Sequence, residues 1–249
     1  MSRPKVVPAL SVVVPAYNER RRLPGTLERL RRHLDAAREP YECIVVDDGS
    51  GDGTGDLVEA AAPTWPELRC LRLPFNEGKG RAVQAGMIDA RAELRLFSDA
   101  DLSTPIEELT RLRAALAEGA DIAIASRALP ASRVEVHQAW TREAMGKTYN
   151  RMLQLLVLPG IHDSQCGFKL YTARAVRLCF EPLTTFRFGF DAEVLLRARL
   201  AGLRVAEVPV RWEDQRGTRV SSVRDSSQML VDLLRLRRRL GRARRPAAG

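Results

Sequence analysis

The first half of the chain alternates short apolar runs with amphipathic segments. Continuous apolar runs bounded by polar residues predict buried strands of a parallel sheet that is covered on both faces. Leu10–Pro15 and Cys43–Asp47 are such runs, and we predict three more strands at Leu68–Leu73, Leu94–Ser98 and Asp121–Ser126. Apolar positions at helical spacing predict the helices Leu23–Ala37, Thr54–Ala62, Gly80–Arg91 and Pro105–Glu118 between them. We therefore predict an α/β fold with a mostly parallel sheet flanked by helices.

The second half of the chain has longer amphipathic segments. Apolar residues at helical spacing predict a helix over Trp140–Leu158. The elements predicted after it are a strand at Gly167–Ala173, a helix at Asp191–Ala201, a strand at Leu203–Trp212 and a helix at Ser222–Leu240. We expect a single domain over residues 1–240, with C-terminal amphipathic helices, and a basic tail over residues 241–249.

The composition narrows the class of protein. The chain has 249 residues, 45% of them hydrophobic, which is enough for one large domain. No window approaches about 18 uninterrupted apolar residues, so we expect no transmembrane helix. The N-terminal apolar run lacks a cleavage site, and we interpret it as the first strand and not as a signal peptide. The four cysteines show no CxxC spacing, which indicates the reduced thiols of a cytoplasmic protein.

The net charge of +9 is concentrated near the C-terminus, where seven arginines lie between Arg235 and Arg245. This segment is either a solvated helix end with a frayed tail or a contact for an anionic partner, such as a membrane surface or nucleic acid. The chain has no helix-turn-helix, RNP or zinc signature, so we do not expect it to bind nucleic acid.

The acidic stretch Asp47–Glu59 (DDGSGDGTGDLVE) nearly fits a calcium-binding loop counted from Asp48. Such a loop is entered from a helix, whereas the residues YECIVVD before this stretch predict a strand. Ser50, at the third position, weakens the match further. We therefore interpret the stretch as a turn, after which Thr54 begins a helix, and only Asp47 and Asp48 are expected to face a ligand.

Polar clusters follow each of the first five predicted strands. They are PAYNE (Pro15–Glu19), DDGS (Asp47–Ser50), NEGKG (Asn76–Gly80), DAD (Asp99–Asp101) and SR (Ser126 and Arg127). Because the carboxyl ends of parallel strands meet at one edge of a sheet, we expect these clusters to converge. Asp99 and Asp101 suit a hard divalent cation, although the same pattern also forms Asx turns that precede a helix. Lys79, between two glycines, indicates close backbone approach to a phosphate.

The segments SVVVPAYNE, YECIVVDDGSGDGT, NEGKGRAV and LFSDADLS, in this order and spacing, resemble the family-2 glycosyltransferases with the GT-A fold. The later segments DSQCGFKLY, FGFDAEVLLRA, AEVPVRW and RGTRVSSVRD are similar to those of dolichyl-phosphate β-glucosyltransferases and their bacterial polyprenyl-phosphate relatives. Dolichyl-phosphate mannose synthases share the first half but typically lack QCGFK, so they rank second. The resemblance implies a GT-A (Rossmann-like) fold with a nucleotide-sugar-binding half, residues 8–127, and an acceptor-binding half, residues 128–240.

The resemblance implies that matching positions bind a UDP-sugar donor and a divalent metal, Mg²⁺ or Mn²⁺. The implied donor-binding residues are Pro15, Ala16, Tyr17, Glu19, Asp47, Asp48, Lys79, Asp99, Ala100, Arg216 and Arg219. Asp99 and Asp101 form the D-x-D motif, with Asp101 as the expected direct metal ligand. Ser103 stands where mannose synthases have glutamine, which leaves the identity of a third protein ligand open.

The implied acceptor is a polyprenyl or dolichyl monophosphate, to which an inverting enzyme transfers a hexose, with glucose from UDP-glucose expected. Its phosphate oxygen is already an anion at neutral pH, so no strong base is required. The expected acceptor-phosphate contacts are Arg127, Arg142 and Lys169, and the expected catalytic residues are Asp99, Asp101, Arg127 and Asp191. We expect Asp191 to orient the sugar, whereas with a hydroxyl acceptor it would act as the general base. A synthase that uses GDP-mannose is the other alternative.

Close relatives often carry a transmembrane anchor, which this chain is expected to lack. The basic amphipathic helix Trp140–Leu158 and the arginine tail would instead hold the protein peripherally on an anionic membrane surface, or else the acceptor is soluble. The oligomeric state is left open, a homo-oligomer included.

Overall fold

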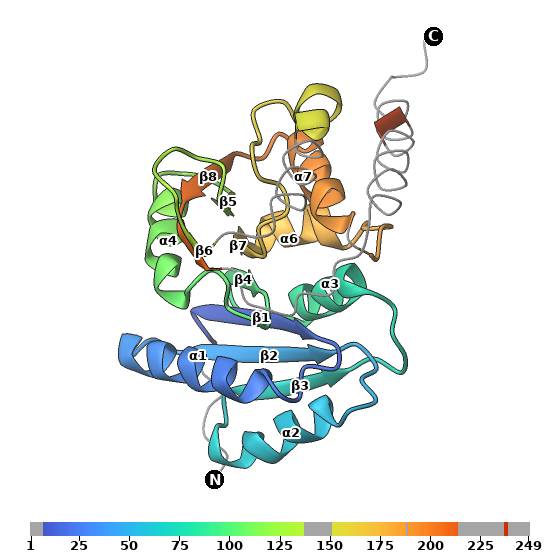
Figure 1. The fold of residues 1–249 in the computed structure, drawn as a ribbon. Coiled ribbons are helices and arrows are strands. Elements are labelled where there is room, and N and C mark those ends of the chain that lie inside the picture. The colour runs from blue at the N-terminus through green and yellow to red at the C-terminus, as the bar shows by residue number, and fades with distance from the viewer. Residues whose placement is uncertain (1–6, 137–150, 188, 214–236, 239–249) are drawn as a thin grey trace.

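The computed structural model describes residues 7–136, 151–187, 189–213 and 237–238. In this part of the chain a seven-stranded sheet has the order β3-β2-β1-β4-β7-β5-β8 (Figure 1). Its strands are β1 (Leu10–Ala16), β2 (Tyr41–Asp47), β3 (Leu68–Arg72), β4 (Leu94–Ser98), β5 (Ile122–Ser126), β7 (Phe168–Thr172) and β8 (Val205–Pro209). A second sheet pairs β6 (Arg133–Val136) with β9 (Arg211–Glu213).

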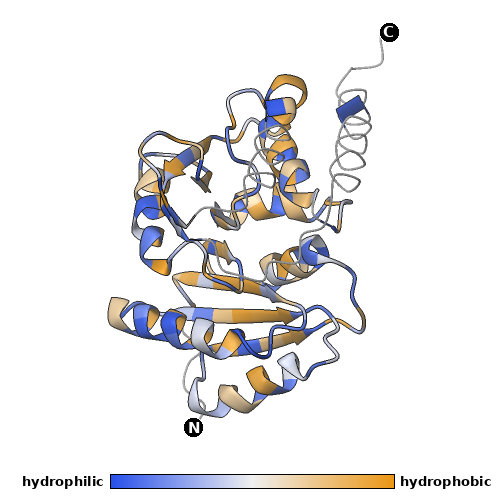
Figure 2. Cartoon of the chain, viewed as in Figure 1, coloured by the Kyte–Doolittle hydropathy of each residue, from blue (hydrophilic) through white to orange (hydrophobic). Residues whose placement is uncertain are grey.

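Helices cover both faces of the large sheet. The helices on one face are α1 (Leu23–Ala37), α2 (Thr54–Ala61) and α4 (Leu109–Ala117), with the short η1 (Ala62–Thr64) and η2 (Ile106–Glu108) beside them. Those on the other are α3 (Lys79–Asp89), α6 (Ala173–Phe180) and α7 (Phe190–Leu200). Side chains of β1 alternate between the two cores, so that Val12 packs on the α1 side and Val13 on the α3 side. Figure 2 shows the resulting concentration of apolar residues along β1 and β2.

The sheet is mixed because β7 runs antiparallel to both of its neighbours, β4 and β5. The other neighbouring strands pair in parallel. The antiparallel position of β7 places its first residue, Phe168, opposite Ser98, the last residue of β4. The residues just before β7 therefore lie beside the D-x-D motif just after β4. A parallel strand would have placed them at the opposite edge of the sheet.

The structure confirms the predicted α/β class and the first five strands and four helices, with boundaries shifted by a few residues. The pattern missed β6 and α6. The predicted strand Leu203–Trp212 is in fact two strands, β8 and β9, which belong to different sheets. The division follows Pro209, which has no N–H for a sheet hydrogen bond. No side-chain hydrogen bond caps η2 or α4.

The structure also describes the helix after the acidic turn and parts of the two long helices predicted in the second half. Helix α2 begins at Thr54 as expected, because Asp52 accepts a hydrogen bond from the Thr54 N–H at 3.0 Å. Residues 151–156 are helical, and the remainder of the predicted helix up to residue 150 lies outside the described residues. Of the predicted helix Ser222–Leu240 only residues 237–238 are described, and both are helical.

Candidate active site

Hydrogen bonds tie the loop after β1 to the loop after β2. The backbone N–H of Asn18 donates to Ser50 Oγ at 2.9 Å, and that of Glu19 donates to Thr54 Oγ1 at 2.9 Å. The side chain of Tyr17, which directly precedes Asn18 in the chain, is 42% exposed. Pro15 and Ala16 end β1 and are buried. The segment expected to line the nucleobase site therefore lies at the carboxyl edge of the sheet, beside the acidic turn.

Asp47 and Asp48 have different surroundings. Asp47 is buried at the end of β2, where one of its carboxylate oxygens accepts a hydrogen bond from the Ser50 N–H at 3.0 Å. The two carboxylate oxygens of Asp48 accept from the backbone N–H groups of Glu77, at 2.9 Å, and Gly78, at 3.0 Å. Asp48 is thus a support for the NEGKG loop. The expected contact of Asp48 with a nucleotide stays a prediction.

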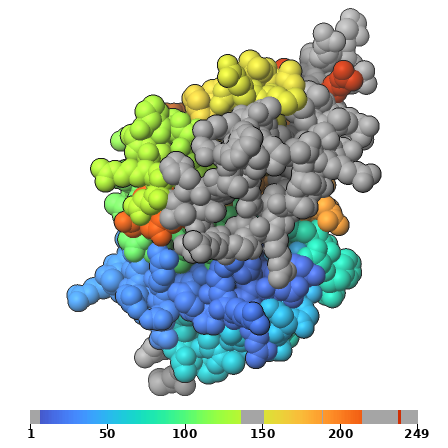
Figure 3. Space-filling view, in the orientation of Figure 1, coloured from blue at the N-terminus to red at the C-terminus, as the bar shows by residue number. Residues whose placement is uncertain are grey.

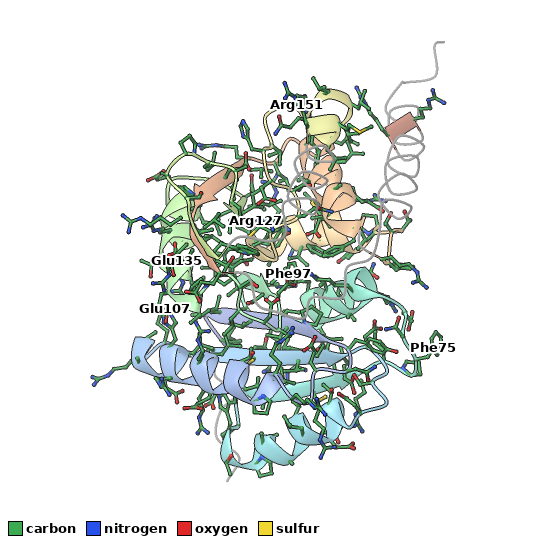
Figure 4. All side chains as sticks on the ribbon, in the orientation of Figure 1. Phe75, Phe97, Glu107, Arg127, Glu135 and Arg151 are labelled. Carbon is green, nitrogen blue, oxygen red and sulfur yellow. The ribbon has the colours of Figure 1, made fainter. Side chains whose placement is uncertain are left out.

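Lys79 begins α3 and extends toward the end of β4. Its ammonium nitrogen lies 2.7 Å from Asp99 Oδ1 and 5.4 Å from the centre of the Phe97 ring, which Figure 4 shows in the middle of the molecule. Burial alone would lower the pKa of Lys79, but the negative charges of Asp99 and Asp191 outweigh burial and raise it. Lys79 is therefore a fixed cation beside the D-x-D motif.

The D-x-D residues form a tight turn after β4. Asp101 Oδ1 accepts a hydrogen bond from the Ser103 N–H at 3.0 Å, and the carbonyl of Ala100 accepts from the Thr26 hydroxyl at 2.6 Å. Burial, followed by the negative charge of Asp99, raises the pKa of Asp101. Two neighbouring carboxylates of this kind are most stable as anions when a cation lies between them.

Gly167 provides the space for the Asp99 carboxylate. The Gly167 carbonyl accepts the Asp99 N–H at 2.9 Å. A Cβ atom at Gly167 would lie 2.0 Å from Asp99 Oδ2, so any side chain there would displace the carboxylate. The end of β4 and the start of β7 meet at this point, so the QCGFK segment needs a glycine here to leave room for the Asp99 carboxylate.

Asp191 lies in the first turn of α7 and forms a buried ion pair with Lys169 of β7. The ammonium of Lys169 also donates to the carbonyl of Cys166 at 2.7 Å, and the Lys169 side chain is 0% exposed. Burial raises the pKa of Asp191, and the charges of Lys169 and Lys79 oppose that rise. The expected contact between Lys169 and an acceptor phosphate does not fit this placement, because protein atoms enclose the ammonium.

Arg127 follows β5 and forms a two-point ion pair with Asp163. The distances are 2.6 Å from Nε to Oδ2 and 2.9 Å from Nη2 to Oδ1. The backbone N–H of Asp163 donates to Glu207 Oε1 at 2.9 Å, and this hydrogen bond holds Asp163 in place. The Arg127 guanidinium lies 5.3 Å from the centre of the Trp212 ring, and its side chain remains 29% exposed. The expected contact between Arg127 and an acceptor phosphate stays a prediction.

The structure thus gathers Lys79, Asp99 and Asp191 near Phe97, with Asp101 following in the same turn as Asp99. The expected site residues Arg142, Arg216 and Arg219 lie outside the described residues. Sequence reasoning recognised the segment DSQCGFKLY but assigned no role to Asp163 or Gly167. Its only signal for them was the segment itself, because the partners of both residues are far away in the chain.

The D-x-D carboxylates fit a divalent cation. Their oxygens are the ligands that Mg²⁺ and Mn²⁺ prefer, and burial, followed by the charge of Asp99, raises the pKa of Asp101, a rise that a bound cation would oppose. Within the described residues no group of three or more His, Cys, Asp or Glu side chains could enclose a metal ion. Asp99 and Asp101 would therefore hold a cation that takes further ligands from a bound diphosphate or from water.

The sequence pattern of glycosyl transferase family 2 matches residues 11–180 of the chain. The chain belongs to this family. It is a glycosyltransferase, as the resemblance implied. All five strand-end clusters and Lys169 lie in the matched region, whereas Asp191 follows it.

Curated relatives match over most of the chain. A dolichyl-phosphate beta-glucosyltransferase of Dictyostelium discoideum is 35% identical over 240 residues, which are 92% of this chain and 73% of the relative. The one of Homo sapiens is 33% identical over 243 residues, 92% of this chain and 75% of the relative. Glycosyltransferase AglD of Haloferax volcanii is 33% identical over 231 residues, 91% of this chain but 36% of that longer protein.

Solved structures confirm the GT-A fold. Glucosyl-3-phosphoglycerate synthase from Mycobacterium tuberculosis, in complex with Mn²⁺, UDP and phosphoglyceric acid, superposes with a TM-score of 0.69 at 19% identity, over 97% of this chain and 81% of that one. Its complex with Mn²⁺ and UDP-glucose gives a TM-score of 0.67 at 18% identity, over 97% and 81% of the two chains. At these identities the similarity concerns the fold.

Proposed function

We propose that this glycosyltransferase moves glucose from UDP-glucose to a polyprenyl or dolichyl monophosphate, with inversion, to give a polyprenyl-phosphate β-glucose and UDP. The observation that carries the proposal is the pair of carboxylates at the carboxyl end of β4, Asp99 and Asp101, with Lys79 beside them. The relatives named dolichyl-phosphate beta-glucosyltransferases, which match over about nine tenths of the chain, support this acceptor.

The donor is proposed to lie across the carboxyl edge of the sheet. The segment Pro15–Glu19 and Asp47 would contact the uridine, because the loops after β1 and β2 form one hydrogen-bonded surface. Asp99 and Asp101 would hold Mg²⁺ or Mn²⁺, which neutralises charge on the departing UDP. Lys79 would contact the diphosphate, since its ammonium already lies beside Asp99. Charge on the leaving group is thereby compensated before the bond breaks.

The acceptor phosphate is proposed to approach from the side of Arg127. A phosphate monoester is an anion near neutral pH, so its attack needs positive charge and alignment more than it needs a base. Arg127 supplies a cation whose orientation is fixed by Asp163 and whose side chain is partly exposed. Asp191, which is paired with Lys169, would orient the sugar and would not take a proton.

The decisive experiment is transfer of radiolabelled glucose from UDP-glucose into an organic-extractable product. The purified protein would be supplied with a polyprenyl phosphate and with Mg²⁺ or Mn²⁺ in separate reactions. Labelled lipid that requires both metal and acceptor is the expected result. Parallel reactions with other UDP-sugars and with GDP-mannose test the donor. No labelled lipid from any donor, with a folded protein that binds UDP, would refute the proposal.

We also propose that the protein reaches its acceptor at an anionic membrane surface. In the residues that the structure describes, no helix is long and apolar enough to cross a membrane. The helical residues 151–156 expose Leu155, which is 78% accessible, and Met152, which is 40% accessible. Leu155 lines a groove of about 250 Å³ together with Arg199 and Arg237. Exposed apolar side chains beside two arginines suit the interface between headgroups and acyl chains.

This surface lies far from the donor half of the molecule. Figure 3 shows residues 151–160, in yellow, at the opposite end of the molecule from the first three strands and α2. Arg151 marks the same end in Figure 4. A membrane that contacts this end would leave the nucleotide-binding loops after β1 and β2 open to the aqueous phase, as a soluble donor requires.

A further inference from the structure

The buried ion pair between Lys169 and Asp191 needs an explanation that the D-x-D motif does not supply. A fully buried lysine is rare, because an ammonium removed from water must recover its solvation from protein groups. Lys169 recovers it from the Asp191 carboxylate on α7 and from the Cys166 carbonyl, which lies just before β7. Its ammonium also lies 5.6 Å from the centre of the Phe97 ring.

The segment Cys166–Lys169 touches both carboxylates of the reaction centre. The carbonyl of Gly167 accepts the N–H of Asp99, and Lys169, two residues later, holds Asp191. Lys79 extends toward the same place from α3, and its charge acts on Asp99 and Asp191 together. Asp99 and Asp191 are therefore each paired with a lysine, Asp99 with Lys79 and Asp191 with Lys169.

We propose that Lys169 is a positioning residue that sets the acceptor class: by holding Asp191 in an ion pair, it makes the site suited to an anionic phosphate and unsuited to a hydroxyl group. This inference rests on the proposed function. Without Lys169, the Asp191 carboxylate would keep only Lys79 as a compensating charge. In its ionised form it would then repel an anionic acceptor and be available to take a proton from a hydroxyl group. The ion pair removes both properties, since Lys169 compensates the charge and occupies Oδ1.

The two acceptor classes differ in what happens to a proton. With the lipid phosphate, a phosphate oxygen bonds to the anomeric carbon of glucose, the bond from that carbon to UDP breaks, and UDP leaves with the electron pair. No proton has to be removed. With water or another hydroxyl acceptor, the same bonds form and break, but the O–H proton must pass to a base. Asp191 is the carboxylate that would accept it, once freed from Lys169.

The test is a double-mutant cycle with Lys169→Met, Asp191→Asn and the variant that carries both substitutions. Methionine keeps most of the length of lysine, and the double variant contains no unpaired buried charge, a replacement that proteins often tolerate. Two quantities are measured for each protein: the KM for a polyprenyl phosphate, and the fraction of UDP released by hydrolysis of UDP-glucose. Calorimetric binding of UDP with Mn²⁺ and thermal unfolding report whether each variant is folded.

We expect K169M to raise the KM for the lipid phosphate by about tenfold or more, and to raise the hydrolysed fraction, because Asp191 is then unpaired. In the D191N background the same substitution should change that KM by no more than about twofold. Arg197→Met is the matched control, since Arg197 forms another ion pair on α7, with the buried Glu193. That control should lower the unfolding temperature without raising the hydrolysed fraction.

Three results would overturn the inference. If D191N abolishes transfer to the lipid, Asp191 acts as a base or as an essential contact. K169M that impairs the D191N enzyme as much as the wild type would mean that Lys169 does not act through Asp191. An unchanged KM in K169M would exclude an effect on the acceptor. If K169M does not fold, the comparison of D191N with the double variant remains, and a KM that rises more than about twofold between them would overturn the inference. If the wild-type protein transfers no label to lipid, both the proposed function and this inference are refuted. If it does transfer label, but the effects of K169M and D191N on the KM are independent of each other, only this inference is refuted.

Discussion

Lys79 and Asp99 form an ion pair of 2.7 Å that joins the start of α3 to the end of β4. Each partner has a second proposed role, the lysine toward a diphosphate and the carboxylate toward a metal ion. Binding of a metal–nucleotide complex would therefore give both charges new partners of opposite sign. The pair keeps the two groups in place until that complex binds, and the charge of Asp99 helps to raise the pKa of Lys79.

Replacing Lys79 should weaken donor binding. We expect Lys79→Met to raise the Kd of UDP in the presence of Mn²⁺ by about tenfold, which corresponds to about 1.4 kcal/mol for one lost charge-assisted contact. Titration calorimetry measures the change. Arg81→Met, which removes another cation of α3, whose partner is Glu77 in the preceding loop, is the control and should leave the Kd unchanged. Equal affinity in the wild type and K79M would exclude the contact with the diphosphate.

The metal should depend on Asp101. We expect Asp101→Asn to abolish the enhancement of UDP binding by Mn²⁺, because one of the two carboxylates that fit the cation is lost. Binding of UDP is compared with Mn²⁺ and with a chelator present. Asp89→Asn serves as the control, since Asp89 is a partly exposed acid that pairs with Arg69 at the end of α3. Metal-dependent binding that survives in D101N would contradict the D-x-D assignment.

Gly167 and Gly25 should respond in opposite ways to alanine. At Gly167 a Cβ atom would lie 2.0 Å from Asp99 Oδ2, whereas at Gly25, in α1, no atom lies within 4 Å. Gly167→Ala should lower transfer at least tenfold by displacing the carboxylate. Gly25→Ala should leave transfer unchanged and stabilise the fold by about 0.5–1 kcal/mol, because alanine restricts the unfolded chain. Rate assays measure the effect on transfer, and urea unfolding measures the effect on stability, for both variants. Full activity in G167A would contradict the placement of Asp99.

Acid should destabilise the protein partly through Asp163. Burial alone would raise the pKa of Asp163, but the charge and hydrogen bonds of Arg127 outweigh burial and lower it. Since the pKa of an aspartate in an unfolded chain is about 3.9, the pair stabilises the fold fully above about pH 5. That contribution is lost as the pH falls through about 4 toward the lowered folded pKa, because the unfolded chain then binds the proton first.

The variant Asp163→Asn should therefore be less stable at neutral pH and less sensitive to acid. We expect a loss of about 2–3 kcal/mol at pH 7, below the range for a fully buried pair because Arg127 is partly exposed. Its further loss between pH 5 and pH 3 should be smaller than that of the wild type. Urea unfolding at several pH values tests this, with Glu28→Gln as a control in an exposed pair. Parallel pH profiles of D163N and the wild type would contradict the prediction.

Leu155 should contribute to membrane binding. We expect Leu155→Glu to reduce cosedimentation with vesicles that contain anionic lipid, since it places a negative charge among exposed leucines and arginines. Phe75→Glu is the control, because Phe75 is 64% exposed but lies on the donor half of the molecule (Figure 4). Similar binding by both variants would place the membrane contact elsewhere.

Much of the fold was readable from local pattern. The runs at β1 and β2 are buried on both faces, so the apolar residues Val12–Val14 and Cys43–Val46 are contiguous and leave little ambiguity. Helix α6 was missed because it follows β7 without a loop, at Thr172 and Ala173. The pattern over Leu203–Trp212 predicted one long strand and could not show that the chain changes sheets after Pro209. Which strand a segment pairs with depends on the tertiary structure.

For the candidate site, too, the sequence predicted the placement of some residues, and only the structure showed the role of others. The positions of Asp99 and Asp101 followed from their place after a strand, and those of Asp47 and Lys79 did so as well. The role of Asp48 did not, because an acid in a turn can face a ligand or hold a neighbouring loop, and only the positions of Glu77 and Gly78 decide between them.

The sequence by itself determined the α/β class, the strand ends that carry polar side chains and, through its motifs, the family. It determined these because burial, turn formation and metal preference depend on residue type over a few neighbouring positions. The tertiary structure alone decided that β7 lies antiparallel beside β4, which gives Gly167 its position under Asp99. It also decided that Lys169 pairs with Asp191 and does not reach solvent. The physical reason is that charges separated by many residues acquire partners, and therefore roles, only when the sheet brings their strands together.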